Sequence, residues 1–154
     1  MSAPLFYEDV PCGFKFESGG IVVTESHIVQ FAGLSGDFFD VHMDDRFAQS
    51  LGFPRRIAHG LLCLALVDGL KNRAESRFAA VASLSWQWNF RSAVFIGDRI
   101  AARITVSDKR MTRRADRGIL TLQLEAFNQD GKVVQDGSNL LMVEARSAQA
   151  EEEE

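Results

Sequence analysis

One short segment of the chain concentrates acidic side chains around a histidine. Residues 35–45 read Ser-Gly-Asp-Phe-Phe-Asp-Val-His-Met-Asp-Asp and hold four acids and one of the three histidines. Asp37 and His42 lie five positions apart, so in a loop their side chains can converge on one small volume. A water held there could lose a proton to one group while the other protonates a substrate. We therefore predict that Asp37 and His42 form an acid/base pair.

A structural role for the same two residues is an open alternative. Aspartate commonly closes a turn through its own carboxylate. Asp37 would then stabilise the loop, and His42 would cap the short helix that follows. Spacing alone does not decide between turn formation and catalysis.

A second cluster lies where a strongly apolar segment begins. Residues 55–62 read Arg-Arg-Ile-Ala-His-Gly-Leu-Leu. Because Gly60 has no β-carbon, a substrate carbonyl could approach its N–H closely, and the unpaired amides of a first helical turn stabilise negative charge on such an oxygen. This predicts an oxyanion hole at Gly60. Alternatively, Gly60 only permits close packing, and His59 is a structural hydrogen-bonding residue.

The segments around both clusters have predictable secondary structure. Residues 21–23 read as a short strand, and apolar residues at helical spacing predict a helix from Glu25 to about Leu34. A loop is expected over 35–42 and a short helix over 44–50. Between about Ala58 and Leu70 apolar residues cover nearly the whole circumference, which is typical of a helix buried on most sides. This segment is the expected central helix.

Beyond residue 78 the pattern changes to alternation of apolar and polar residues, which indicates an antiparallel sheet. Asp130-Gly131 predicts a hairpin turn, Gly137 is a candidate bulge, and Trp86 and Trp88 are expected in core or dimer packing. The expected strands lie around 84–90, 99–106, 119–127 and 132–143.

The order of these elements describes an α+β protein whose curved antiparallel sheet wraps around one long helix, a hotdog-like layout. We assign residues 1–146 to this domain and the acidic residues 147–154 to a disordered tail. The formal charge of −4 includes that tail, so the folded part is nearly neutral and a nucleic-acid partner is not indicated. Cys12 and Cys63 show neither disulfide nor metal spacing. With no apolar run of 18 residues and no leader pattern, we expect a cytoplasmic protein without a membrane partner.

Three motifs resemble those of the MaoC-like (R)-specific enoyl-CoA hydratases and dehydratases. The hydratase motif Gly-Asp-x-Asn-Pro-x-His-x-Asp is matched at four anchor positions by residues 36–44. The family's Ala-His-Gly-Met/Leu-Leu segment is matched by residues 58–62, and its Phe-x-Gly-Asp segment by residues 95–98. The likeness runs from about residue 5 to residue 145 and keeps the motifs in order.

The resemblance implies a hotdog lyase that hydrates a 2-enoyl-CoA or dehydrates a 3-hydroxyacyl-CoA, and we expect a homodimer or a higher homo-oligomer. Asp37 and His42 would activate water and exchange a proton with the α-carbon, and the amide of Gly60 would face the thioester oxygen. We expect no metal, and coenzyme A only as part of the substrate. The predicted substrate-binding residues are Phe38, Phe39, His59 and Leu61.

The chain departs from the hydratase motif at two positions. Phe39 replaces the family's Asn and Asp40 replaces its Pro, so a polar group and a rigid residue are lost beside the acid/base pair. We hypothesise that Phe38 and Phe39 line an acyl pocket or the underside of the loop, and that Asp40 faces solvent or replaces the polar group. Asp68, on the buried helix, is either a hydrogen-bonded structural acid or a member of the site.

Other functions and sites stay open at this point. A hotdog thioesterase would direct water at the carbonyl carbon instead of C3, and a non-catalytic acyl-thioester binding module would use the same pocket without chemistry. Basic side chains are candidates for binding the phosphates of coenzyme A, although charged groups near turns are commonly only solvated. These candidates are Arg55, Arg56, Arg91, Lys109, Arg110, Arg113 and Arg114.

Overall fold

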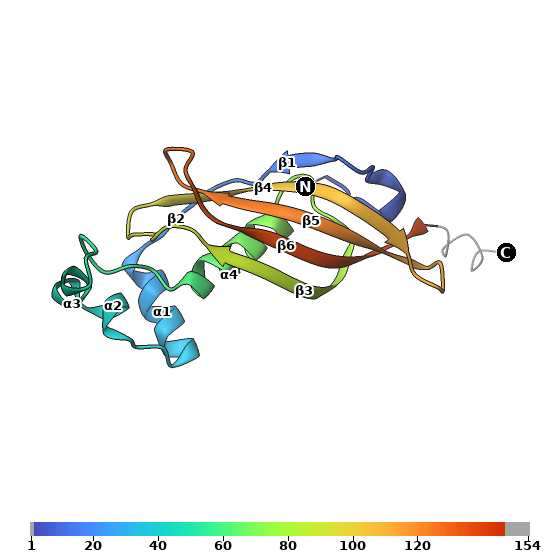
Figure 1. Cartoon of the computed structure of the whole chain (residues 1–154). Helices are drawn as coiled ribbons and strands as arrows, with labels where there is room; N and C mark the ends of the chain where they lie inside the picture. The colour runs from blue at the N-terminus through green and yellow to red at the C-terminus, as the bar shows by residue number, and fades with distance from the viewer. Residues whose placement is uncertain (1, 147–154) are drawn as a thin grey trace.

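The computed structural model describes residues 2–146, in which a curved antiparallel sheet packs against one long helix (Figure 1). This is the predicted hotdog arrangement. The helices are α1 (Glu25–Ser35), α2 (Asp40–Met43), α3 (Asp45–Ser50) and α4 (Gly60–Asn72), with a 3-10 turn η1 (Tyr7–Asp9). The strands are β1 (Lys15–Glu17), β2 (Ile21–Val22), β3 (Ala80–Phe90), β4 (Arg99–Met111), β5 (Arg117–Phe127) and β6 (Val133–Glu144).

The strands follow the order β1-β4-β5-β6-β3, with β2 also paired to β4, and all neighbours are antiparallel. Alternate residues of the central strands are fully buried and meet the inner face of α4, so the two periodicities in the sequence build a single core. The main contributors from β4 and β5 are Ile100, Ile104, Leu120, Leu122 and Leu124. From α4 they are Leu62, Cys63 and Val67.

The central helix begins and ends two residues later than its expected bounds. Its inner face is buried, but one stripe is open to solvent in the single chain, and Leu61 is 60% exposed. The prediction of burial on most sides is therefore correct only for the faces that meet the sheet. Trp86 and Trp88, half-buried, pack against the core, as one of the two expectations for them states.

One strand was not predicted, and two local predictions are wrong. Strand β1 was not anticipated, because it has only three residues and one inward side chain, Phe16. The expected loop over 35–42 contains the start of α2. Gly137 is not a bulge, since it pairs in register with Trp88 and Leu124; a β-carbon there would lie 2.0 Å from the carbonyl oxygen of Gln87, so glycine allows close approach of the strands.

Two further expectations concern the boundaries of the domain and its surroundings. Residues 147–154, predicted to form a tail, lie outside the described residues. Within residues 2–146, none of the helices combines the length and apolar character needed to cross a lipid bilayer.

Candidate active site

The helices α1, α2 and α3, with their connections, form a helical lobe (residues 25–57) at one end of the sheet (Figure 1). Helix α1 ends at Gly36, which adopts the left-handed conformation with φ of 79°. A residue with a side chain rarely takes this conformation, so the glycine permits the sharp turn that leads into Asp37. The single turn of α2 then carries His42 back toward Asp37.

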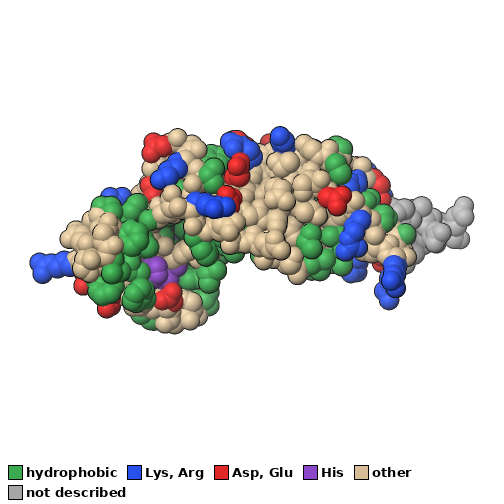
Figure 2. All heavy atoms as spheres, in the orientation of Figure 1, with side chains coloured by type: hydrophobic (Ala, Val, Ile, Leu, Met, Phe, Trp, Pro, Cys, Tyr) green, Lys and Arg blue, Asp and Glu red, His purple; other side chains and the backbone are tan. Residues whose placement is uncertain are grey.

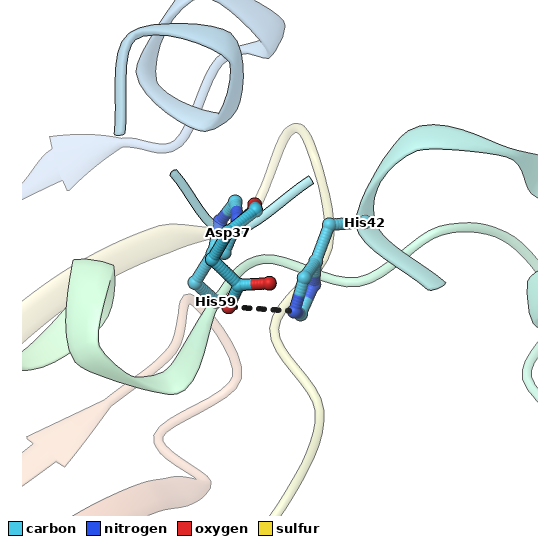
Figure 3. A group of neighbouring side chains, drawn as sticks. All are labelled: Asp37, His42 and His59. Carbon is cyan, nitrogen blue, oxygen red and sulfur yellow. Dashed lines mark hydrogen bonds and ion pairs between the residues drawn. The ribbon is translucent and has the colours of Figure 1, made fainter. Parts of the chain in front are cut away.

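The two residues of the predicted pair do converge. Oδ2 of Asp37 lies 3.9 Å from Nε2 of His42, and the carboxylate is turned toward the imidazole (Figure 3). The other oxygen of Asp37, Oδ1, accepts a hydrogen bond from the N–H of Phe39 at 3.2 Å. Asp37 therefore closes its turn with one oxygen and faces His42 with the other, so the structural contact does not prevent the predicted pairing.

The alternative for His42 is wrong. The short helix α3 is capped by Asp44, whose carboxylate accepts from the N–H groups of Arg46 and Phe47. His42 lies inside α2 instead, with only 11% of its side chain exposed. Its ring is therefore available for another role.

The protonation of His42 follows from its contacts. Nδ1 lies 2.8 Å from the carbonyl oxygen of Ile57, which can only accept, so Nδ1 carries the proton and Nε2 presents a lone pair. Burial lowers the pKa of His42 below its ordinary value of 6.5, and the nearby His59 also lowers it, against the opposing effects of the Ile57 carbonyl and Asp37. A neutral imidazole facing a carboxylate can accept a proton from a water between them.

His59 connects the lobe to the central helix. Its Nε2 lies 2.9 Å from the backbone carbonyl of Asp37, and its ring stacks on that of His42 with centroids 3.9 Å apart. The residue is 2% exposed and occupies the N-cap position of α4. The expectation that His59 is a structural hydrogen-bonding residue agrees with these contacts.

Gly60 opens the first turn of α4 on the wall of a cavity. No acceptor for its N–H is found among residues 2–146, as expected for the first amide of a helix. A β-carbon at this position would lie 2.6 Å from the ring of Phe90, so the close-packing explanation for the glycine is also correct. The ring of Phe90 occupies the space beside Gly60, and the amide of Gly60 is left available to a ligand.

The cavity between the lobe and the sheet has a volume of about 400 Å³. Histidine side chains are visible in a hollow on this face, with apolar side chains around them and an acidic group beside them (Figure 2). Five of the predicted residues line the cavity: Asp37, His42, His59, Gly60 and Leu61. Phe38 and Phe39 are not among the lining residues and are more than half exposed.

Asp37, His42 and His59 also carry the kinds of atoms that ligate metal ions. The nearest ligand atoms of Asp37, His42 and His59 lie within 4.8 Å of one another. One nitrogen of each ring faces a backbone carbonyl, Nδ1 of His42 that of Ile57 and Nε2 of His59 that of Asp37.

The remaining candidates lie outside the cavity, with one exception. Asp68 pairs with Lys71 at 2.8 Å on α4, as a structural acid would. Lys109 donates to the carbonyls of Tyr7 and Val10, so it stabilises the N-terminal segment. Arg91 does line the cavity, and its Nε donates to Asp136.

Comparisons with known proteins show the family to which the chain belongs. Residues 12–126 match the family model of the MaoC like domain. The chain belongs to this family. It is similar to the (R)-specific enoyl-CoA hydratase of Rhodospirillum rubrum, with 32% identity over 142 residues that cover 92% of this chain and 93% of the relative.

Two further relatives are similar over most of the MaoC-like domain. The 3-hydroxybutyryl-CoA dehydratase of Methylorubrum extorquens is 31% identical over 139 residues, which cover 90% of this chain and 84% of that protein. The crystal structure of the MaoC-like dehydratase from Rhodospirillum rubrum superimposes with a TM-score of 0.83 at 27% identity, covering 92% of this chain and 98% of that one. The chain is thus a member of a hydratase and dehydratase family.

The prediction from sequence missed cavity residues that come from the sheet. Phe90, at the end of β3, and Gln135, on β6, are paired in register and both line the cavity. Gln135 is 2% exposed and lies on the same inward face of β6 as the buried Asn139. A polar residue at an inward position of a strand was the one available signal, since buried polar groups need partners.

Proposed function

We propose that the protein is a hydro-lyase that reversibly adds water to a 2-enoyl-CoA thioester. Asp37, His42 and the amide of Gly60 would carry the reaction. The single observation that supports this most is the convergence of a carboxylate, a neutral imidazole and an acceptor-free helix amide on one cavity. The hydratase and dehydratase relatives agree with this reaction class.

The distances suggest how the water would be held. Two acceptors 3.9 Å apart can each accept one hydrogen bond of about 2.8 Å from the same water. Asp37 Oδ2 would hold one O–H, and Nε2 of His42 would accept the proton of the other as the oxygen bonds to C3. One proton then returns from the pair to C2, so that the elements of one water are added and both residues are restored.

The thioester oxygen would lie at the start of α4. As water adds to C3, negative charge moves through C2 to the carbonyl oxygen, and a donor aimed at that oxygen stabilises the transition state more than the substrate. Gly60 would supply this donor from the end of a 13-residue helix, where the helix dipole adds to the effect. Leu61, which follows Gly60 on the cavity wall, would contact the substrate.

We also propose a homodimer. Strand β3 ends the sheet, and its outer edge has no partner strand in the described part of the chain. Val81 and Leu84 on β3, and Leu61 on α4, are exposed in the single chain. Pairing of two β3 edges would bury these side chains beside the cavity. Light scattering that shows a monomer at the assay concentration would contradict this.

A substrate panel tests the reaction. The wild type, Asp37→Asn and His42→Ala are assayed with crotonyl-CoA, longer enoyl-CoA and carboxylated enoyl-CoA, following the loss of enoyl-thioester absorbance. We expect hydration by the wild type and a loss of about 100-fold to 10,000-fold in each variant. Asp40→Asn is the matched control, since Asp40 is exposed at the start of α2 and lies outside the cavity.

The same assay separates the alternatives. A thiol-trapping reagent reports free coenzyme A, so thiol release without hydration would identify a thioesterase. Saturable binding with neither signal would identify a non-catalytic module. Full hydration rates in both site variants would refute the assigned roles of Asp37 and His42.

A further inference from the structure

A buried glutamine lies on the sheet directly beside the start of α4. The Nε2 group of Gln135 donates to the backbone carbonyl of Gly60 at 3.1 Å. Its Oε1 accepts from the indole N–H of Trp88 at 2.8 Å. An indole N–H can only donate and a backbone carbonyl can only accept, so the amide of Gln135 has one possible orientation. The three groups form a directed chain from β3 through β6 to Gly60.

The sheet contacts Gly60 on another side as well. Phe90 is the register partner of Gln135, and its ring fills the place that a side chain at residue 60 would occupy. The end of β3 is itself held to β6, because the N–H groups of Arg91 and Ser92 both donate to the carbonyl of Val134. Gly60 is thus packed against Phe90 and hydrogen-bonded by Gln135.

Such support matters because glycine is a poor residue with which to begin a helix. It has the greatest backbone freedom of any residue, and the first turn of a helix lacks half of its hydrogen bonds. An oxyanion donor is effective only if it is already aimed at the position of the developing charge. The bond from Gln135 holds the peptide plane that follows Gly60, which limits the backbone rotations that set the direction of the Gly60 N–H.

We infer that Gln135, oriented by Trp88, is a positioning residue that aims the amide of Gly60 at the thioester oxygen. This inference rests on the proposed function for the identity of that oxygen. Residues of β6 and β3, which lie outside the acid/base motif, would thereby contribute to the reaction.

The test uses a ligand that reports charge on the oxygen without being hydrated. A 3-oxoacyl-CoA loses a proton from C2 to give an enolate with its own ultraviolet absorbance, and a donor at the thioester oxygen favours the enolate. The enolate fraction of bound 3-oxobutanoyl-CoA is measured against pH for the wild type, Gln135→Met and Trp88→Phe, together with kcat and KM for hydration.

We expect Gln135→Met to lower both the enolate fraction and kcat, with kcat falling about tenfold to a hundredfold, since misplacing a catalytic group by about 1 Å has an effect of this size. The acid side of the pH profile should not move, because His42 is untouched. Trp88→Phe, which keeps a ring but loses the N–H, should lower the enolate fraction and kcat in the same way but by less. The double variant of Trp88→Phe and Gln135→Met should behave like Gln135→Met alone. Gln123→Met, on the exposed face of β5, is the matched control.

The outcomes separate the inference from the proposed function. If Gln135→Met and Trp88→Phe match the wild type in enolate fraction, the inference is wrong, whether or not the protein hydrates enoyl-CoA. If the wild type hydrates nothing, the proposed function fails, and the enolate comparison still decides the role of Gln135. If Gln135→Met does not fold, Trp88→Phe decides alone. If the losses of the two single variants add fully in the double variant, Trp88 does not act through Gln135.

Discussion

The sheet with α4 and the helical lobe are built in different ways. The first is an interdigitated apolar core, in which residues such as Ile104, Leu122 and Val67 are fully buried. The lobe has little core of its own, and Leu34 and Leu51 are exposed at 86% and 53%. It is attached to the sheet and α4 by Ile28, which joins the main core, and by polar contacts such as Arg55 Nη2 to the carbonyl of Ile96 and His59 Nε2 to the carbonyl of Asp37.

The candidate active site lies at the junction of the two regions, and each region contributes different groups to it. The lobe supplies the carboxylate and the imidazole, whereas α4 supplies the amide, and His59 connects them. Changes within the core should therefore act mainly on stability. Changes at the junction should act mainly on the rate of the reaction.

The largest effect on stability is expected in the core. Leu122→Ala removes a fully buried side chain from β5 and should lower the free energy of unfolding by about 2–5 kcal/mol. Leu34→Ala, on the exposed face of α1, should change it by less than about 0.5 kcal/mol. Urea or thermal unfolding measures both. If both variants lose the same free energy of unfolding, Leu34 contributes to a core although its side chain is exposed.

The second prediction breaks the connection between the regions. His59→Phe keeps a ring against His42 but loses the bond to the carbonyl of Asp37, and His59→Gln keeps a donor within reach of that carbonyl but loses the stacked ring. A neutral hydrogen bond contributes about 1 kcal/mol, so we expect His59→Phe to lower kcat roughly fivefold and His59→Gln to retain more activity. If both variants keep full kcat, His59 does not position the loop.

The third prediction concerns how the titration of His42 changes kcat/KM and stability with pH. Because burial lowers the pKa of His42 and the neutral ring is the proposed base, kcat/KM should stay level as the pH falls to 6.5 and decrease only below it. The folded state binds this proton less tightly than the unfolded state, so the same titration should destabilise the protein as the pH falls below about 6.5. An acid limb centred above 6.5 would contradict the assignment.

The motif residues and the core could be predicted from sequence because their information is local. Asp37 and His42 share one glycine-bounded segment, and the period of β4 or α4 is visible within each element. Strand β1, with three residues, is too short to show a period. The pairing of Phe90 with Gln135 depends on the register between strands 45 positions apart, which no single segment records.

Phe39 provides the smallest and most local test of the lobe. Its ring meets that of His42 edge-on with centroids 6.3 Å apart, and it also packs against Phe47 at 5.6 Å. Phe39→Asn should admit water to the imidazole and raise the pKa of His42 toward its ordinary value, so that the acid limb of kcat/KM moves to higher pH.

Phe38→Asn is the matched control for this shift, because Phe38 is equally exposed but has no aromatic partner within residues 2–146. It should leave the limb in place. If the two variants shift the limb equally, the burial of His42 does not depend on the Phe39 ring. If Phe39→Asn instead raises turnover sharply with no shift, the phenylalanine hinders the reaction by occupying space that a polar side chain would use, and its effect is on geometry and not on the pKa of His42.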